Sequence, residues 1–221
     1  AKCWGHNMKG QLGQGDLLYN SISLFAPEFI DPINTIALGS THGCGLSYSG
    51  KVYCWGADLT EQLGDNSSTD SYLPLNILGL GPGVLDISSG NGFSCAITGE
   101  NGVKCWGYNW HGELGNGTPS EISIPVPGDV VGLSSGVASI ASGDNHTCAL
   151  LTDGSVECWG VNEKGQLGNN SNDNSSIPVS VNGLDSDTVE SLYAGGEQTC
   201  VITSAGEVKC WGAVEFGENI V

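Results

Sequence analysis

The tripeptide Cys-Trp-Gly constrains this chain more than any other feature, because it recurs at nearly constant spacing. It begins at residues 3, 54, 105, 158 and 210, so the period is 51 to 53 residues. Self-similarity at such a period indicates a repeat architecture in which neighbouring units bury a shared apolar core. One domain, 1–221, is therefore expected, made of units 1–35 (partial), 36–86, 87–139, 140–191 and 192–221 (partial).

Each unit has the pattern of short strands separated by turns. Residues 149–151 and 155–157 are apolar or mixed segments around Asp153-Gly154, which is a hairpin signal. Residues 137–140 and 177–179 predict further strands, and Pro178 favours a strand start or an edge. Convincing helical periodicity with caps is absent from the sequence. A repeat of this length built only from strands predicts an all-β propeller with one sheet per repeat.

Eight of the nine cysteines form pairs that are ten residues apart: Cys44 with Cys54, Cys95 with Cys105, Cys148 with Cys158, and Cys200 with Cys210. Across a hairpin such residues face each other with Cα atoms about 4.5–5.5 Å apart, and a disulfide accepts about 4.4–6.8 Å. The pattern predicts four disulfides. Because such pairing is rare in the cytosol, it also predicts a secreted, cell-surface or periplasmic protein.

Two alternatives to disulfides remain, zinc ligation and free buried thiols. His42 and His146 each lie two residues before a paired cysteine and would supply a further zinc ligand. Phe93 and Gln198 occupy that position in the other two units, which weakens the zinc pattern. Cys3 has no partner ten residues upstream, so its partner is expected in sequence outside 1–221 or in another molecule.

The tryptophan of each Cys-Trp-Gly should point to the opposite sheet face from its cysteine, because side chains alternate along a strand. Packing between neighbouring sheets is its expected role, with ligand stacking as the alternative. The repeated glycines are expected in tight turns or at close strand approaches.

Five Asn-x-Ser/Thr sequons are candidate N-glycosylation sites: Asn66, Asn116, Asn145, Asn169 and Asn174. Chance matches in Asn- and Ser-rich loops are the alternative interpretation. Residues 65–70 and 169–176 hold the oxygen ligands that calcium prefers, yet neither matches the spacing of a calcium loop, so solvated turns are expected.

The net charge of −18 with six Lys and Arg argues against binding to nucleic acids or acidic membranes. It favours a basic protein or a cation, unless the charge serves solubility alone. Membrane insertion is not expected either, because no run of 18 apolar residues occurs.

Catalysis has little support in the sequence. Residues 132–136 spell Gly-Leu-Ser-Ser-Gly, a nucleophile-elbow string, but that motif needs a strand–turn–helix context that is not expected here. The four histidines do not recur in a charge-relay arrangement. We expect no enzyme activity, no catalytic residues, no metal site and no cofactor.

The unit at residues 143–168 contains Gly143, His-Thr-Cys-Ala-Leu at 146–150, Asp153-Gly154, Cys-Trp-Gly-x-Asn at 158–162 and Gly-Gln-Leu-Gly at 165–168. This pattern resembles the RCC1 (regulator of chromosome condensation) repeat, and the resemblance covers nearly the whole chain. It implies a propeller of four-stranded antiparallel blades, usually seven, of which about four are present here.

Members of that family include a nuclear exchange factor, a plant ultraviolet receptor and a secreted β-lactamase inhibitor, so the fold does not select a function. The paired cysteines and acidic charge fit the nuclear role badly. The receptor role needs a tryptophan cluster, whereas only Trp110 lies outside Cys-Trp-Gly.

The expected function is a non-enzymatic extracellular scaffold or interaction module for protein or glycan contact, self-assembly or attachment to a longer chain. A secreted enzyme inhibitor is the alternative, and a guanine-nucleotide exchange factor is less favoured. Function is expected where the repeats differ, in loops near Asn66, Asn116 and Asn170 and in the link from Asp16 to Asn34.

Overall fold

The computed structural model describes residues 2–18, 20–25, 31–184 and 188–213, and it confirms the predicted all-β propeller fold. Antiparallel strands form five sheets in this part of the chain. The same residues contain no helix long and apolar enough to cross a bilayer. Residues 214–221 of the last unit, and residues 19 and 26–30 of the link between Asp16 and Asn34, lie outside the described ranges.

Three sheets have four strands each, and their strands follow the chain order from one edge to the other. The first sheet consists of β3 (Ile33–Leu38), β4 (His42–Ser47), β5 (Val52–Gly56) and β6 (Ser71–Asn76). The second consists of β7 (Asp86–Ser89), β8 (Phe93–Ile97), β9 (Val103–Asn109) and β10 (Ser120–Asp129). The third consists of β11 (Val137–Ser142), β12 (His146–Leu151), β13 (Val156–Gly160) and β14 (Ser175–Ser180).

The remaining two sheets are smaller in the described residues. One pairs β1 (Lys2–Gly5) with β2 (Asn20–Phe25), and the other holds β15 (Val189–Gly195), β16 (Gln198–Thr203) and β17 (Val208–Gly212). Strands β3, β7, β11 and β15 begin one to three residues before the unit boundaries expected at 36, 87, 140 and 192.

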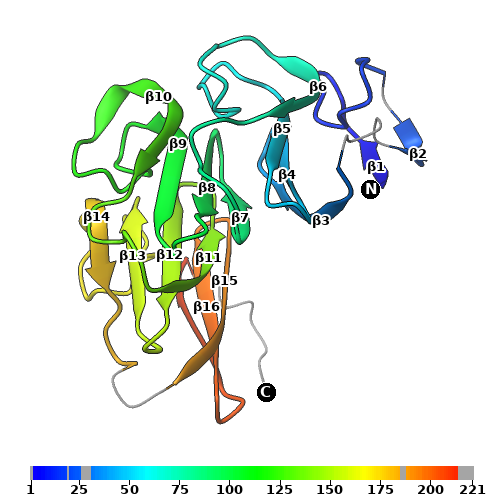
Figure 1. Ribbon diagram of the computed structural model, residues 1–221. Coiled ribbons are helices and arrows are strands. Elements are labelled where there is room, and N and C mark those ends of the chain that lie inside the picture. Colours follow the sequence, from blue (N-terminus) through cyan, green and yellow to red (C-terminus); the bar gives the residue numbers. More distant parts are fainter. Residues whose placement is uncertain (1, 19, 26–30, 185–187, 214–221) are drawn as a thin grey trace.

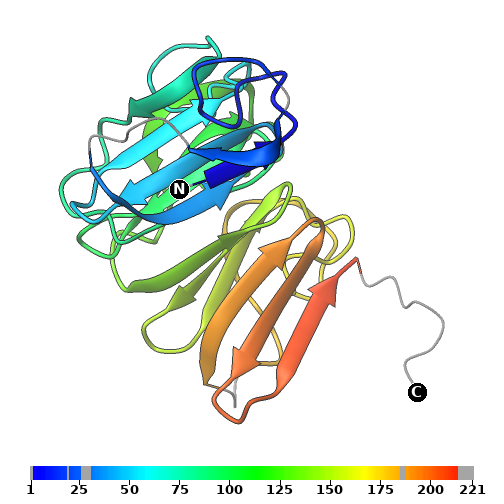
Figure 2. The same cartoon turned by 90° about the vertical axis from the view of Figure 1, so that its right-hand side faces the viewer.

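The sheets fan out around a common axis like blades (Figures 1 and 2). Strands β3, β7, β11 and β15 lie on the concave side of the fan and contact one another in sequence order. The outer strands β6, β10 and β14 form the rim, and Pro178 lies on the outer strand β14, as its edge preference predicts.

The hairpin at the centre of each sheet has the predicted register. The two cysteines of each hairpin are direct partners across the strands: Cys44 and Cys54, Cys95 and Cys105, Cys148 and Cys158, and Cys200 and Cys210. Each Cys-Trp-Gly glycine lies at or near the end of its strand with a positive φ, 103° at Gly160, where a Cβ would lie 2.5 Å from the carbonyl oxygen of Asn145. Glycine is therefore required where the strand turns into the next loop.

The hydrophobic core lies between the sheets. One cluster joins Cys95 and Cys105 of the second sheet to Trp159 of the third. Another cluster joins Cys44 and Cys54 to Trp106 of the second sheet. Each tryptophan and its neighbouring cysteine thus face opposite sides of the same sheet, as strand alternation predicts. This arrangement makes each sheet's tryptophan the contact to the preceding sheet.

The two flat faces of the propeller differ in their connections. We call the side with the β3–β4 and β5–β6 loops and their counterparts the loop face. We call the side with the β4–β5 hairpin and its counterparts the hairpin face. The loop face carries the long segments between the third and fourth strands, where the repeats differ most in sequence.

Candidate interaction face

One buried polar side chain holds each loop that follows Cys-Trp-Gly by a hydrogen bond to the loop backbone. It lies two residues after the glycine and is fully buried in four repeats. Its Oδ1 accepts a hydrogen bond from the backbone N–H of a buried leucine, in the pairs Asn7–Leu12, Asp58–Leu63, Asn109–Leu114 and Asn162–Leu167. The bond satisfies a buried backbone donor while the leucine supplies apolar burial. Together they hold the loop against the sheet.

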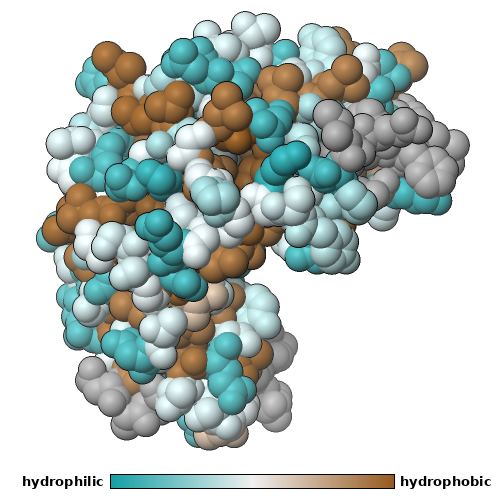
Figure 3. Space-filling view, in the orientation of Figure 1, coloured by the Kyte–Doolittle hydropathy of each residue, from teal (hydrophilic) through white to brown (hydrophobic). Residues whose placement is uncertain are grey.

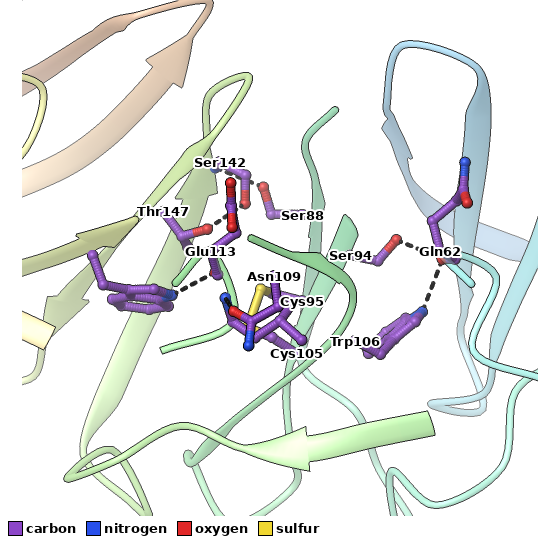
Figure 4. Close-up of a disulfide and its surroundings, with 12 residues drawn as sticks. Gln62, Ser88, Ser94, Cys95, Cys105, Trp106, Asn109, Glu113, Ser142 and Thr147 are labelled. Carbon is purple, nitrogen blue, oxygen red and sulfur yellow. Dashed lines mark hydrogen bonds between the residues drawn. A yellow bond between two sulfur atoms is a disulfide. The ribbon is translucent and has the colours of Figure 1, made fainter. Parts of the chain in front are cut away.

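The tryptophans attach to these loops from the next sheet. Nε1 of Trp106 donates to the carbonyl oxygen of Gln62 at 2.9 Å, and Ser94 donates to the same oxygen at 3.1 Å (Figure 4). A Cβ on Gly64 would lie 2.6 Å from Nε1 of Trp106, and φ there is +77°, so the indole packs on a bare Cα. Four of the five motif tryptophans, those that make this contact, are therefore scaffold as the packing hypothesis predicts, whereas Trp4 is 63% exposed. Equivalent carbonyls accept from Trp55, Trp159 and Trp211.

The residue after each buried anchor projects into solvent. Met8, Leu59 and Trp110 are 60%, 81% and 54% exposed, and they occupy this position in three consecutive repeats. Glu163, which is also exposed, occupies it in the next repeat. Exposed apolar groups that gather on one face mark interaction sites more often than scattered ones do. We call Met8, Leu59 and Trp110 the apolar arc.

A hollow of about 320 Å³ lies beside the arc, lined by Lys9, Leu59, Thr60, Asn91, Tyr108 and Asn145, among others. The Trp110 ring stacks on His111, with centroids 6.5 Å apart and planes 16° apart, and it is tilted against Tyr108 at 6.3 Å. These contacts hold the indole in place. A positioned aromatic side chain beside amide and hydroxyl groups is suited to binding a partner with both apolar and polar groups.

Carboxylates predominate among the charged groups of the loop face. Asp144, Glu163 and Asp173 are exposed, together with Lys164, whereas Nζ of Lys9 is paired with Asp70 at 3.0 Å. Apolar and polar residues are interspersed over the surface in Figure 3. The loop face therefore combines apolar contact points with negative charge.

His42 and His146, which the sequence offered only as alternative zinc ligands, connect neighbouring sheets. Nε2 of His42 lies 2.8 Å from Oγ of Ser94, and Nε2 of His146 lies 2.8 Å from Oγ1 of Thr199. Burial lowers the pKa of both imidazoles to about 4, so both are neutral at pH 7. Ser94 donates onward to Gln62, so these buried His–hydroxyl pairs stabilise the junctions between sheets.

The paired cysteines form four disulfides in the structure, and these bonds join Cys44 to Cys54, Cys95 to Cys105, Cys148 to Cys158, and Cys200 to Cys210. Their Cα atoms are 4.0–4.1 Å apart, which is closer than the separation expected from the sequence. The two cysteines of each hairpin are direct cross-strand partners, as the hairpin spacing predicts.

Because the eight sulfurs are covalently bonded in four pairs, they do not form a zinc site with His42 or His146. Cys3 is a free, half-buried thiol, and burial raises its pKa. No group of three His, Cys, Asp or Glu in the described residues is arranged to hold a metal ion.

The five sequons all lie on the loop face but differ in what their side chains do. Oδ1 of Asn116 and of Asn169 accepts from the buried anchors Asn109 and Asn162, and Oδ1 of Asn174 accepts from the Asn162 backbone. Asn145 is half-buried beside the hollow. Asn66 is exposed, with φ at +66°. Glycosylation at these positions stays a prediction.

Other sequence candidates have structural surroundings of their own. The Gly132–Gly136 string forms the connection between β10 and β11, with Leu133 buried in the core. In the acidic loop 65–70, Asp65 accepts from the Ser67 backbone and Asp70 from the Asp58 backbone. The carboxylate oxygens of this loop thus accept hydrogen bonds from nearby backbone N–H groups.

The apolar arc was not anticipated from the sequence. The signal in the sequence lies two residues before the start of each Gly-x-Leu-Gly element or its variant. That position holds Met8, Leu59 and Trp110 in three repeats and Glu163 in the next repeat. The expected loops near Asn66, Asn116 and Asn170 lie on the same face, farther along each connection.

Known proteins share this repeat. The pattern described as "Regulator of chromosome condensation (RCC1) repeat" matches residues 49–97, 102–150 and 153–202. The chain is 30% identical to human E3 ubiquitin-protein ligase HERC2 over 95% of its length, which covers 4% of that protein. It is 28% identical to the Arabidopsis thaliana ultraviolet-B receptor UVR8, over 97% of this chain and 49% of the receptor. The chain thus spans at most about half of these relatives.

Solved structures share the fold. Yeast RCC1 (Prp20), in a crystal structure with Kap60 bound, superposes with a TM-score of 0.81 at 22% identity, covering 96% of this chain and 51% of that one. Human WBSCR16 superposes with a TM-score of 0.82 at 23% identity, covering 95% and 56%. With three matched repeats spanning most of its length, the chain belongs to the RCC1 (regulator of chromosome condensation) repeat family.

Proposed function

We propose that this chain is a non-enzymatic, extracellular protein-interaction module that binds a basic protein partner through its loop face. The apolar arc carries the proposal, because Met8, Leu59 and Trp110 are exposed at equivalent positions of consecutive repeats. Aromatic residues and Met are enriched in protein interfaces, and tryptophan is a frequent hot spot. Relatives whose names describe a receptor or a complex with another protein also support an interaction role.

Charge supports the choice of partner. The net charge is −18, and Asp144, Glu163 and Asp173 are exposed on the loop face. A partner with basic groups around an apolar centre would complement both features, and opposite charge would accelerate its association. The expected contact therefore weakens with added salt, because exposed charges are screened.

The four hairpin disulfides support the extracellular part of the proposal, since reducing compartments rarely maintain such bonds. Mass spectrometry of the protein isolated from its source, with and without reductant, tests this part. Four intact bridges are expected. Free thiols at all eight positions would overturn the extracellular assignment and leave the interaction face untouched.

The interaction itself is tested with two matched double variants. The first, Leu59→Ser with Trp110→Ser, removes apolar surface from the loop face. The second, Leu78→Ser with Leu85→Ser, removes exposed leucines from the connection between β6 and β7. The immobilised protein captures partners from surface and secreted fractions, and binding of each identified partner is then measured in purified form.

We expect at least about a tenfold loss of affinity for the loop-face variant only, in line with hot-spot energies. Equal binding by both variants would contradict the proposed face.

A further inference from the structure

In two loops of the loop face, the side-chain amide of the buried anchor donates hydrogen bonds across the loop and holds it closed. Nδ2 of Asn162 donates to Oδ1 of Asn169 at 3.1 Å and to the carbonyl oxygens of Ser171 and Asp173. Nδ2 of Asn109 donates to Oδ1 of Asn116 at 3.3 Å and to a loop carbonyl. In these loops the anchor is both an acceptor toward the following leucine and a donor toward the loop.

The first complete sheet has a carboxyl group at each of the two corresponding positions. Asp58 replaces the anchor asparagine and Asp65 replaces its loop partner, so that a pair of carboxyl groups stands where the other loops have two amides. Oδ1 of Asp58 accepts from the Leu63 N–H at 2.9 Å, and Oδ2 lies 3.2 Å from the Ser67 hydroxyl. The same hydroxyl lies 3.3 Å from Oδ2 of Asp65.

An ionised carboxylate has no hydrogen to donate, whereas a carboxylic acid has one. Asp58 is fully buried, and burial raises its pKa to about 7. The charged groups that act on it are Asp65 and Glu61, both of which raise the pKa further. Asp70 accepts from the Asp58 backbone N–H and is paired with Lys9 of the preceding unit. No cation among these groups is paired with the Asp58 side chain in the described residues.

We propose that Asp58 is a pH-sensitive latch that closes loop 65–70 as a neutral carboxylic acid and releases it on ionisation. The loop contacts both neighbouring units, because Asp70 is paired with Lys9 and the Asn66 N–H donates to the Pro125 carbonyl at 3.0 Å. The Ser67 hydroxyl has one hydrogen, so its contacts with Asp58 and Asp65 are both hydrogen bonds only while Asp58 is protonated and donates to it. Ionisation of Asp58 leaves one of these two contacts without a hydrogen and places a second negative charge beside Asp65 in a buried site. Loop 65–70 therefore opens as pH rises through neutrality, while loop 169–174 with its amide anchor stays closed.

The direction follows from linkage. The folded protein holds the Asp58 proton more tightly than the unfolded chain, whose aspartates have their ordinary, lower pKa. The stabilising contribution of the neutral latch is complete below the ordinary aspartate pKa of about 4 and is lost as pH rises from there through about 7. This pH dependence is opposite in sign to that of an aspartate in a salt bridge.

Amide hydrogen exchange at pH 6 and pH 8, expressed as protection factors, tests the latch. In the intact protein we expect the protection of residues 63–70 to fall at least about tenfold more than that of residues 167–174. Asp58→Asn is expected to abolish the fall, because it restores the amide anchor. Asn162→Asp is expected to produce the same fall in protection at residues 167–174. This variant tests the latch even if Asp58→Asn does not fold.

Two outcomes would overturn the latch. One is a fall at residues 63–70 that persists in Asp58→Asn, which would assign the pH response to other groups. The other is unchanged protection of residues 167–174 in Asn162→Asp at pH 8, which would show that a carboxyl group at the anchor does not open its loop.

Discussion

Two junctions between neighbouring sheets occupy equivalent places and are built differently. At the His42 junction, between the first and second complete sheets, the His42 imidazole lies 2.8 Å from the Ser94 hydroxyl of the next sheet. At the Phe93 junction, between the second and third, the phenyl ring of Phe93 occupies the histidine position. The facing hydroxyl, Thr147, pairs within its own sheet with Ser142 at 3.2 Å.

The two junctions share the contact between tryptophan and loop. Trp106 donates to the Gln62 carbonyl and Trp159 donates to the Glu113 carbonyl, both at 2.9 Å. At both junctions the inner ring, His42 or Phe93, packs closely on a glycine of its own sheet. The difference teaches that the indole contact is common to both junctions, whereas the inner position holds an imidazole at one and a phenyl ring at the other.

Removing the shared contact should have the largest effect. Trp106→Ala and Trp159→Ala are each expected to lower the free energy of unfolding by about 3–5 kcal/mol, through lost burial and a lost hydrogen bond. Chemical denaturation measures both. Similar losses at the two junctions support the shared role, and a loss of less than about 1 kcal/mol at either would break it.

The second-largest effect is expected in acid, where the two junctions should differ in how their stability depends on pH. The pKa of His42 is about 4 in the folded protein and about 6.5 in the unfolded chain, so stability falls as pH drops from about 6.5 to about 4. His42→Phe should remove up to about 3 kcal/mol of this acid sensitivity. Unfolding free energies at pH 7 and pH 4.5 measure the change, with Phe93→Leu as a control that adds no titrating group. An unchanged pH slope in His42→Phe would contradict the assignment.

A matched pair of isosteric changes tests the hydroxyls. Thr199→Val removes the acceptor for His146 and the donor to Gln166, so we expect a loss of about 1–3 kcal/mol. Thr147→Val breaks only the bond to Ser142 and should cost less than about 1 kcal/mol. Thermal unfolding at pH 7 compares them. Equal losses would show that the histidine bond adds nothing to its junction.

The smallest effect on stability is expected from the side chain of the residue whose carbonyl oxygen accepts the tryptophan hydrogen bond, Gln62 or Glu113. Glu113 is buried where the His42 junction has Gln62, and its Oε1 has no hydrogen-bond partner in the described residues. Burial raises the pKa of Glu113, so the contribution of its neutral form is lost as pH rises. Glu113→Gln should therefore stabilise the protein by about 1 kcal/mol at pH 8 and by less at pH 5. Gln62→Glu provides the reverse change, and a stabilising effect of that variant at pH 8 would refute the argument.

Much of the scaffold was predictable because it repeats. The hairpins that pair Cys44 with Cys54 and Cys200 with Cys210 follow from a spacing of ten residues around one turn, which is a local property. The opposite directions of a motif cysteine and its tryptophan follow from strand alternation. The interaction face was less predictable, because residues such as Leu59 and Tyr108 become neighbours of one hollow only after the sheets have assembled.

By itself, then, the sequence determined the repeat, the sheets, the cysteine pairs and the opposite directions of each motif cysteine and its tryptophan, since these follow from the recurring spacing and from strand alternation. Only the tertiary structure decided that His42 meets Ser94 of the next sheet, that Asp58 is sealed from water, and that Met8, Leu59 and Trp110 share a face. The physical reason is that burial and charge depend on what packs against a group. In a repeat protein such as a propeller, each unit packs against its neighbours on either side.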